Sequence, residues 1–144
     1  MRSPRQRRYL AGTSGKASSG QACWSAADLS SRSWACASAA SSGGSAWDWH
    51  LVEPELRERG HDSVAVDLPN EDASAGWPDY VDAVVGALGS RTGVIVVGHS
   101  LGGFTAPLVA DRIPVDLLVF VAGMVPAPGE LFADWWTNTG YEPS

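Results

Sequence analysis

One stretch of the sequence limits the possible folds more than any other: a run of β-branched residues that ends in a glycine-rich turn. Residues 93–98 read Gly-Val-Ile-Val-Val-Gly, and they are followed by His99, Ser100, Leu101, Gly102 and Gly103. An unbroken apolar run of this kind favours a strand that is buried on both faces, as in parallel sheets covered by helices. The stretch therefore predicts an α/β fold.

The residues on either side alternate between helical and strand patterns. We predict helices over 47–59, 78–88 and 101–111, and strands over 63–67, 93–98 and 115–121. Asp48 is the expected N-cap of the first helix, Gly60 and Gly89 are expected stops, and Pro107 is the weak point of the third helix. This order of elements is typical of a parallel sheet with crossover helices.

The composition changes abruptly near residue 46. The first 45 residues contain no valine or isoleucine, whereas the remaining 99 contain 14 valines. The first part has a net charge of +5 and the rest −11, which gives the chain −6. We expect residues 1–45 to be a low-complexity, disordered or irregular segment, because so little branched apolar surface does not offset the ordering entropy. Residues 46–144 are then the folded domain.

The same change motivates a hypothesis about the origin of the chain. Residues 1–45 are read in a shifted frame or spliced from elsewhere, and the domain that follows is incomplete. Translating the flanking DNA in every forward frame would test this hypothesis.

Composition also argues against several classes of function. A net charge of −6 is wrong for general nucleic-acid binding, which needs a cationic face. No apolar run of about 18 residues occurs, so we expect no membrane-spanning helix. Cys23 and Cys36 have no neighbouring Cys or His, so we expect no metal site.

The first segment carries no recognisable cofactor or export motif. The stretch 12–16 resembles a phosphate loop only loosely, since Leu10 and Ala17 stand where the pattern needs Gly and Ser/Thr, and we expect no cofactor. Arg7 and Arg8 are not followed by the apolar stretch that an export signal needs. The cytoplasm is therefore the expected location, with an organelle transit peptide as the alternative.

The sequence Gly98-His-Ser-Leu-Gly102 is G-x-S-x-G placed between a strand and a helix. In this motif the serine occupies a sharp, strained turn that lifts its hydroxyl clear of the sheet, and the two glycines remove side chains that would collide. The N–H of Leu101, at the start of a helix, then points at a developing oxyanion. The alternative is a glycine-rich turn whose serine has no role.

Residues 96–103 resemble the nucleophile elbow of the α/β-hydrolase superfamily, and the similarity extends over residues 46–141. The segments 47–61 and 64–69 resemble a helix and strand of small bacterial members. Residues 120–130, with the two tryptophans after them, resemble the cap entry of the branch near plant methyl-esterases and hydroxynitrile lyases.

The resemblance implies a partial α/β-hydrolase core and the start of a cap. It makes Ser100 the nucleophile and the Leu101 N–H an oxyanion donor, with a small ester as substrate. The elbow geometry would rest on Gly98, His99, Gly102 and Gly103. Trp135 and Trp136 are candidate residues of an apolar substrate pocket.

Other parts of a hydrolase site have no counterpart. The family's second oxyanion donor comes from a His-Gly turn, where this chain has Ala40 and Ser41. The triad order in this fold is serine, acid, histidine, and no histidine follows Ser100. The histidines present are expected to have packing or surface roles, and the later aspartates do not fit the family's acid position: His50, His61 and His99; Asp111, Asp116 and Asp134.

Two functional hypotheses from different classes follow. The first is a serine hydrolase, or a lyase of the same fold, that is inactive alone and receives its missing groups from a longer product or a partner chain. The second is a non-catalytic relic or a partner-dependent binding protein. The oligomeric state is not predicted.

Overall fold

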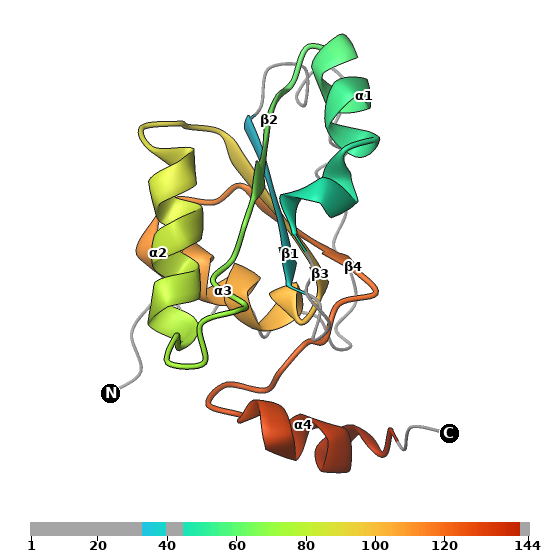
Figure 1. Ribbon diagram of the computed structural model, residues 1–144, viewed down its shortest axis with the longest axis vertical. Coiled ribbons are helices and arrows are strands. Elements are labelled where there is room, and N and C mark those ends of the chain that lie inside the picture. Colours follow the sequence, from blue (N-terminus) through green and yellow to red (C-terminus); the bar gives the residue numbers. More distant parts are fainter. Residues whose placement is uncertain (1–32, 40–44, 142–144) are drawn as a thin grey trace, which may run out of the picture.

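The computed structural model describes the main chain of residues 33–39 and the whole of residues 45–141. These residues contain a four-stranded parallel sheet in the order β2-β1-β3-β4 (Figure 1). The strands are β1 (Ser33–Ala39), β2 (Asp62–Val66), β3 (Val94–Ser100) and β4 (Leu117–Val121). The helices are the 3₁₀ helix η3 (Ala46–Trp49), α1 (Val52–Glu58), α2 (Trp77–Leu88), α3 (Gly102–Arg112) and α4 (Phe132–Thr139). The predicted parallel sheet with crossover helices is confirmed.

Helices cover both faces of the sheet (Figure 1). Alternate residues of β3 point to opposite faces, so Val94 and Val96 pack in a cluster with α2 and α3, whereas Ile95 and Val97 pack with Trp49 of η3. These four of the seven β3 residues are each at least 96% buried. The sheet therefore has two cores, and β3 is buried on both faces as its sequence predicts.

The strand β1 corrects our expectation that the whole of residues 1–45 is disordered or irregular. It lies between β2 and β3, with Ser33 in register with Asp62 on one side and Val94 on the other. A strand in this position receives its main-chain hydrogen bonds from both neighbours, so its own weak strand propensity does not decide its conformation. The rest of that expectation, for residues 1–32 and 40–44, lies outside the described residues.

The predicted helix over 47–59 is two separate elements, and its expected N-cap is wrong. Ser45 is the N-cap of η3: its hydroxyl accepts a hydrogen bond from the Trp47 N–H, and the Asp48 carboxylate accepts one from the Ser45 N–H. Asp48 is thus the third residue of a capping box. Pro54 explains the break, because it has no N–H and is tolerated only in a first helical turn, where α1 places it.

The second and third helices agree closely with the sequence pattern. α2 has Pro78 in its first turn and ends before Gly89, whose φ of +58° suits glycine. α3 continues through Pro107 to Arg112. Both helices supply residues to the same core cluster, including Val84 and Val109, which are fully buried.

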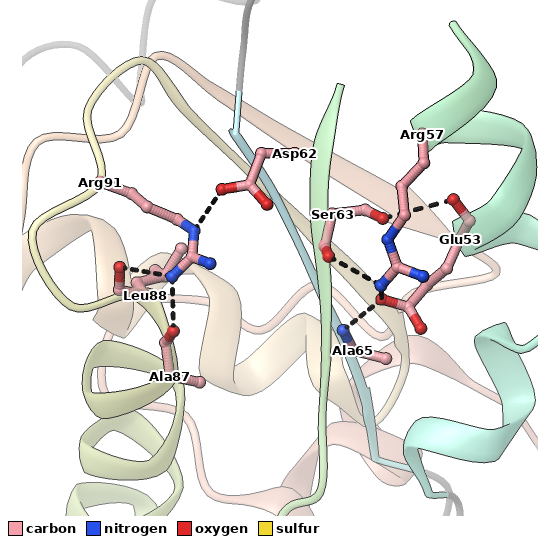
Figure 2. Close-up of polar contacts among 8 residues, drawn as sticks. All are labelled: Glu53, Arg57, Asp62, Ser63, Ala65, Ala87, Leu88 and Arg91. Carbon is pink, nitrogen blue, oxygen red and sulfur yellow. Dashed lines mark hydrogen bonds and ion pairs between the residues drawn. The ribbon is translucent and has the colours of Figure 1, made fainter. Parts of the chain in front are cut away.

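Charged side chains tie α1 and α2 to β2 (Figure 2). Glu53 of α1 accepts hydrogen bonds from the Ala65 N–H at 3.1 Å and from Arg57 at 2.8 Å, and Arg57 also donates to the Ser63 carbonyl. Arg91 pairs with Asp62 at 2.6 Å and donates to two carbonyls at the end of α2. Ser63 and Ala65 are two residues apart, so their main-chain groups face the same side of β2. On that side they bond to Arg57 and Glu53 of α1. Glu53 and Arg57 therefore bond one N–H and one C=O group on the outer edge of the sheet.

We expect Glu53→Ala to lower the free energy of unfolding by about 1–2 kcal/mol, because the partly buried Ala65 N–H loses its acceptor. Glu55→Ala is the matched control. It removes the same kind of i,i+4 ion pair from the same helix, but the Glu55 and Arg59 side chains are 61% and 63% exposed, so we expect a change below about 0.5 kcal/mol. Urea unfolding measures both variants, and equal losses would contradict this role of Glu53.

Candidate active site

The candidate site is the turn between β3 and α3. β3 ends at Ser100, and α3 begins two residues later. Ser100 has a φ of +51°, in the left-handed region that non-glycine residues rarely occupy. Such a conformation costs about 1–3 kcal/mol and persists only where the surrounding structure enforces it. The half-buried Ser100 is thus held in a strained conformation at the carboxyl end of a central strand.

Glycines on both sides allow this turn to close. A Cβ atom added at Gly98 would lie 2.7 Å from the carbonyl oxygen of Gly102. A Cβ atom at Gly103 would overlap the main chain of Met124, again at the carbonyl group. Both contacts are with main-chain atoms, which cannot move aside as a side chain can. The two glycines are therefore required by the close approach of main chains at the elbow.

The segment that follows β4 braces the turn from a second direction. The Met124 N–H donates a hydrogen bond to the Ser100 carbonyl at 2.9 Å, and the Met124 side chain is buried. Ala122, at the end of β4, has a φ of +45° and is the other non-glycine residue with a positive φ in the described part of the chain. The Met124 hydrogen bond thus joins the turn at Ser100 to a segment that itself begins with a positive φ. Sequence reasoning missed this brace, although the pair Ala122-Gly123 directly after an apolar strand is a signal for a turn.

The main chain after Ser100 enters a helix. Leu101 precedes the first residue of α3, in a helical conformation with φ −60° and ψ −21°. The first N–H groups of a helix have no acceptor within it, and the helix dipole makes this end partly positive. The arrangement can therefore stabilise a negative charge that develops beside Ser100.

The histidines are held in other places. The ring of His99 packs edge-to-face on Trp49, with centroids 6.4 Å apart and planes at 88°. His50 stacks on Trp47 at 4.1 Å, and its Nδ1 lies 2.6 Å from the Trp47 carbonyl oxygen. His61 directly precedes β2, at the end of the sheet where the strands begin.

Asp116 lies away from the elbow, and the other two later aspartates are exposed on helices. The Asp116 N–H donates to the Val94 carbonyl at 2.8 Å, so Asp116 sits beside the first residue of β3. Ser100 lies six residue steps along β3 from Val94, or roughly 20 Å at the rise of a strand. Asp111 is exposed in the last turn of α3, and Asp134 is exposed in the first turn of α4.

The two adjacent tryptophans belong to a chain of aromatic rings that connects α4 to the core. Trp77 stacks on Phe104 at 5.2 Å, and the ring contacts continue to Phe132 and Trp136. Trp135 packs edge-to-face on Trp136 and donates its Nε1–H to the Val125 carbonyl at 3.3 Å. Figure 1 shows α4 apart from the sheet, on the side where the strands end. Trp77 thus packs on Phe104 of α3, and a pocket role for Trp135 and Trp136 stays a prediction.

A shallow hollow of about 640 Å³ lies elsewhere, between the loop after β2 and α2. Its charged lining is acidic: Asp67, Asp72, Asp79 and Asp82. Hydrogen bonds from the hydroxyl and the N–H of Ser74 lower the pKa of Asp72. Asp67 accepts a hydrogen bond from the Ala46 N–H, and Asp79 accepts one from the Gly76 N–H, so both carboxylates have structural partners. Within the described residues, no group of three or more His, Cys, Asp or Glu side chains is placed to hold a metal ion.

None of the helices in residues 45–141 is long and apolar enough to cross a membrane.

Known proteins are similar to this chain in sequence and in fold. The chain is 36% identical to a probable esterase, PIR7A, of Oryza sativa subsp. indica, over 61% of this chain and 38% of the relative. It is 31% identical to norfluorocurarine synthase 1 of a Strychnos species, over 58% of this chain and 36% of the relative. A solved structure of a polyneuridine aldehyde esterase mutant superposes with a TM-score of 0.66 at 24% identity, covering 79% of this chain and 49% of that one.

The chain spans little more than a third of the length of these curated relatives. Methylesterase 7 of Arabidopsis thaliana is also among them, at 35% identity over 56% of this chain and 36% of the relative, so the predicted relation to plant methyl-esterases is confirmed. The sequence model of the family described as "Alpha/beta hydrolase family" matches residues 36–143, which are three quarters of the sequence. The match begins inside β1, which agrees with the place of that strand in the sheet. The chain belongs to the alpha/beta hydrolase family.

Proposed function

We propose that this chain carries the nucleophile of an esterase-type serine hydrolase that acts on small-molecule esters, with Ser100 as the nucleophile. The observation that carries the proposal is the φ of +51° at Ser100, between a buried strand and a helix N-terminus. The named esterases among the relatives support an ester substrate.

The geometry of the turn supports the following reaction. The Ser100 oxygen attacks the ester carbonyl carbon and loses its proton to a base, and the carbonyl oxygen becomes an oxyanion. The Leu101 N–H donates a hydrogen bond to that oxyanion, aided by the positive end of α3. Collapse of the intermediate breaks the bond to the alcohol, which leaves with a proton, and water then hydrolyses the acyl-serine.

We assign the role of the base to none of the three histidines. His99 packs on Trp49, His50 is held by Trp47, and His61 lies at the opposite end of the sheet. Without a base the serine hydroxyl is a weak nucleophile, and loss of a triad member typically lowers turnover by about 10⁴–10⁶-fold. We therefore propose that the 144-residue chain reacts slowly alone and that further polypeptide supplies the acid and the histidine.

Added imidazole tests this proposal, because it can act as the missing general base. We expect a fluorophosphonate probe to label the chain slowly, and imidazole to raise the initial rate by about tenfold or more. The formation of the adduct is followed by intact-protein mass spectrometry, with N-methylimidazole as a second base and ethylene glycol as a neutral control. A rate that does not respond to either base would contradict the proposed role of the missing histidine.

The second candidate is a hydrolase-like chain that performs no chemistry, either as a relic or as a partner-dependent binding protein. The ring contacts of His99 and His50 with tryptophans, and the place of His61 at the opposite end of the sheet, favour it. It predicts no adduct on Ser100 at any imidazole concentration. A cytoplasmic location and a shifted reading frame before residue 46 stay predictions.

A further inference from the structure

We propose that Met124 is a positioning residue for the nucleophile elbow: its main-chain N–H orients the Leu101 N–H through the carbonyl group of Ser100. The inference rests on the proposed function, in which the Leu101 N–H is the oxyanion donor. The Met124 N–H donates a hydrogen bond to the Ser100 carbonyl at 2.9 Å. This bond joins the elbow to the turn after β4, which lies on the far side of α3 in the sequence.

The Ser100 carbonyl and the Leu101 N–H belong to one peptide unit. This peptide is trans, and a trans peptide is planar with its C=O and N–H pointing in opposite directions. A hydrogen bond that fixes the direction of the C=O therefore also fixes the direction of the N–H. Because Met124 occupies the carbonyl side, the Leu101 N–H points away from it. A bond accepted by the C=O also polarises the peptide and makes its N–H a stronger donor.

Ser100 needs such a restraint more than an ordinary strand residue does. Its φ of +51° is in the left-handed region, which is unfavourable for a residue with a Cβ atom. A strained residue relaxes wherever its surroundings permit, and a rotation at Ser100 would turn the peptide that follows it. The hydrogen bond from Met124 opposes that rotation.

Met124 is itself held in a fixed place. Its side chain is buried, and a Cβ atom added at Gly103 of α3 would overlap its main chain. A Cβ atom added at the preceding Gly123 would lie 3.0 Å from the Cβ atom of Phe120. The turn is thus in close contact with α3 on one side and with the end of β4 on the other, so the Met124 N–H is a donor in a fixed position.

A second main-chain bond of the same kind lies at the other end of β3. The Asp116 N–H, directly before β4, donates to the Val94 carbonyl at 2.8 Å. Both bonds join a residue that flanks β4 to a terminal residue of β3, but Val94 is six residue steps from Ser100. Loss of either bond should therefore weaken the fold, whereas only loss of the Met124 bond should affect the elbow.

Two reactions of a thiol at position 100 distinguish the orientation of the oxyanion donor from the stability of the fold. In Ser100→Cys, acylation by p-nitrophenyl acetate bonds the thiolate sulfur to the carbonyl carbon, places negative charge on the carbonyl oxygen and then releases p-nitrophenolate. Alkylation by iodoacetamide bonds the sulfur to a CH₂ group and releases iodide, and no oxyanion forms. Both reactions use the same thiolate, so the ratio of their rates reports the oxyanion donor.

An ester bond before residue 124 removes the donor and keeps the side chain, when the α-hydroxy analogue of methionine is incorporated in the Ser100→Cys chain. We expect the ratio of acylation to alkylation to fall about tenfold, which is part of the roughly 10²–10³-fold cost of losing an oxyanion donor completely. The same replacement of the N–H at Asp116 is the matched control and should leave the ratio unchanged. Peptide mass spectrometry reads the adducts at position 100 separately from those at Cys23 and Cys36.

Gly123→Ala in the same chain is a milder second variant, which decides the matter if the ester at 124 prevents folding. The added methyl group would lie 3.0 Å from the Cβ atom of Phe120, so the turn that carries Met124 must shift slightly. We expect the ratio to fall about threefold, because small displacements of a catalytic group reduce rates. Gly86→Ala, inside α2, is its control, and circular dichroism establishes that each chain is folded.

Ser90→Cys supplies the reference ratio, because Ser90 is exposed in the turn after α2. A ratio at position 100 no higher than at position 90 would contradict the oxyanion donor of the proposed function, and this inference with it. A higher ratio that the ester at 124 leaves unchanged, or, where that chain is unfolded, that Gly123→Ala leaves unchanged, would overturn the role of Met124 alone. Equal falls with the esters at 124 and 116 would show a general effect of stability and would overturn it too.

Discussion

Replacing Ser100 with alanine is expected to abolish fluorophosphonate labelling of the chain, with a fall of about 100-fold or more in the adduct formed in the presence of imidazole. The reason is that the strained turn presents this hydroxyl at the carboxyl end of β3, beside the first N–H groups of α3. Alanine keeps the Cβ atom and removes only the nucleophilic oxygen. Intact-protein mass spectrometry measures the adduct.

Ser90→Ala is the matched control, because Ser90 is an exposed serine in the turn after α2 and plays no part in the elbow. We expect this variant to be labelled at the parental rate. Undiminished labelling of Ser100→Ala would mean that another residue reacts, and the assignment of the nucleophile would then be wrong.

Gly103→Ala is expected to lower the free energy of unfolding by roughly 2–4 kcal/mol, the range of severe overpacking at a site that cannot relax. The added methyl group would overlap the main chain of Met124, which hydrogen-bonds to Ser100. The segment after β4 would have to move away from the elbow, so the variant should also lose labelling. Urea unfolding and the labelling assay measure the two effects.

Gly86→Ala provides the opposite result from the same chemical change. Gly86 lies inside α2, and a Cβ atom there would meet nothing within 4 Å. Alanine favours a helix over glycine by about 0.5–1 kcal/mol, so this variant should be stabilised. If Gly103→Ala were as stable as the parent chain, the close approach of Gly103 and Met124 would be refuted.

The strongly patterned elements could be predicted from the sequence. The β-branched run of β3 is buried on both faces as expected, and the apolar stripe of α2 places Val81, Val84 and Leu88 in the core. In these segments the period of the apolar residues agrees with their burial, so local pattern and tertiary packing specify the same structure.

Other elements depend on neighbours that a local pattern does not reveal. β1 is a strand because β2 and β3 bond it from both sides, although its sequence is rich in small residues. The first helix divides because Pro54 fits only a first turn, and Ser45 is the cap because its hydroxyl reaches the Trp47 N–H. In β1 and in the first helix, hydrogen bonding decides the structure and the spacing of apolar residues does not.

The candidate site was predictable to a similar extent. The sequence motif around Ser100 predicts the elbow, and the structure shows a close main-chain approach at Gly98, one of the glycines of that motif. The turn after β4 had a signal in Ala122-Gly123, but the hydrogen bond from Met124 to Ser100 was not predictable, since it joins main-chain atoms of distant segments. Main-chain contacts between distant segments leave little trace in residue types other than glycine.

The most direct test of the account is to map the fluorophosphonate adduct by peptide mass spectrometry on the chain when folded and when unfolded in urea, with imidazole in both samples. If the turn between β3 and α3 creates the nucleophile, the adduct forms on Ser100 in the folded chain and is lost when the chain unfolds. If Ser100 stays unmodified in the folded chain, or reacts no faster there than in urea, the central claim that this elbow presents a nucleophile is contradicted.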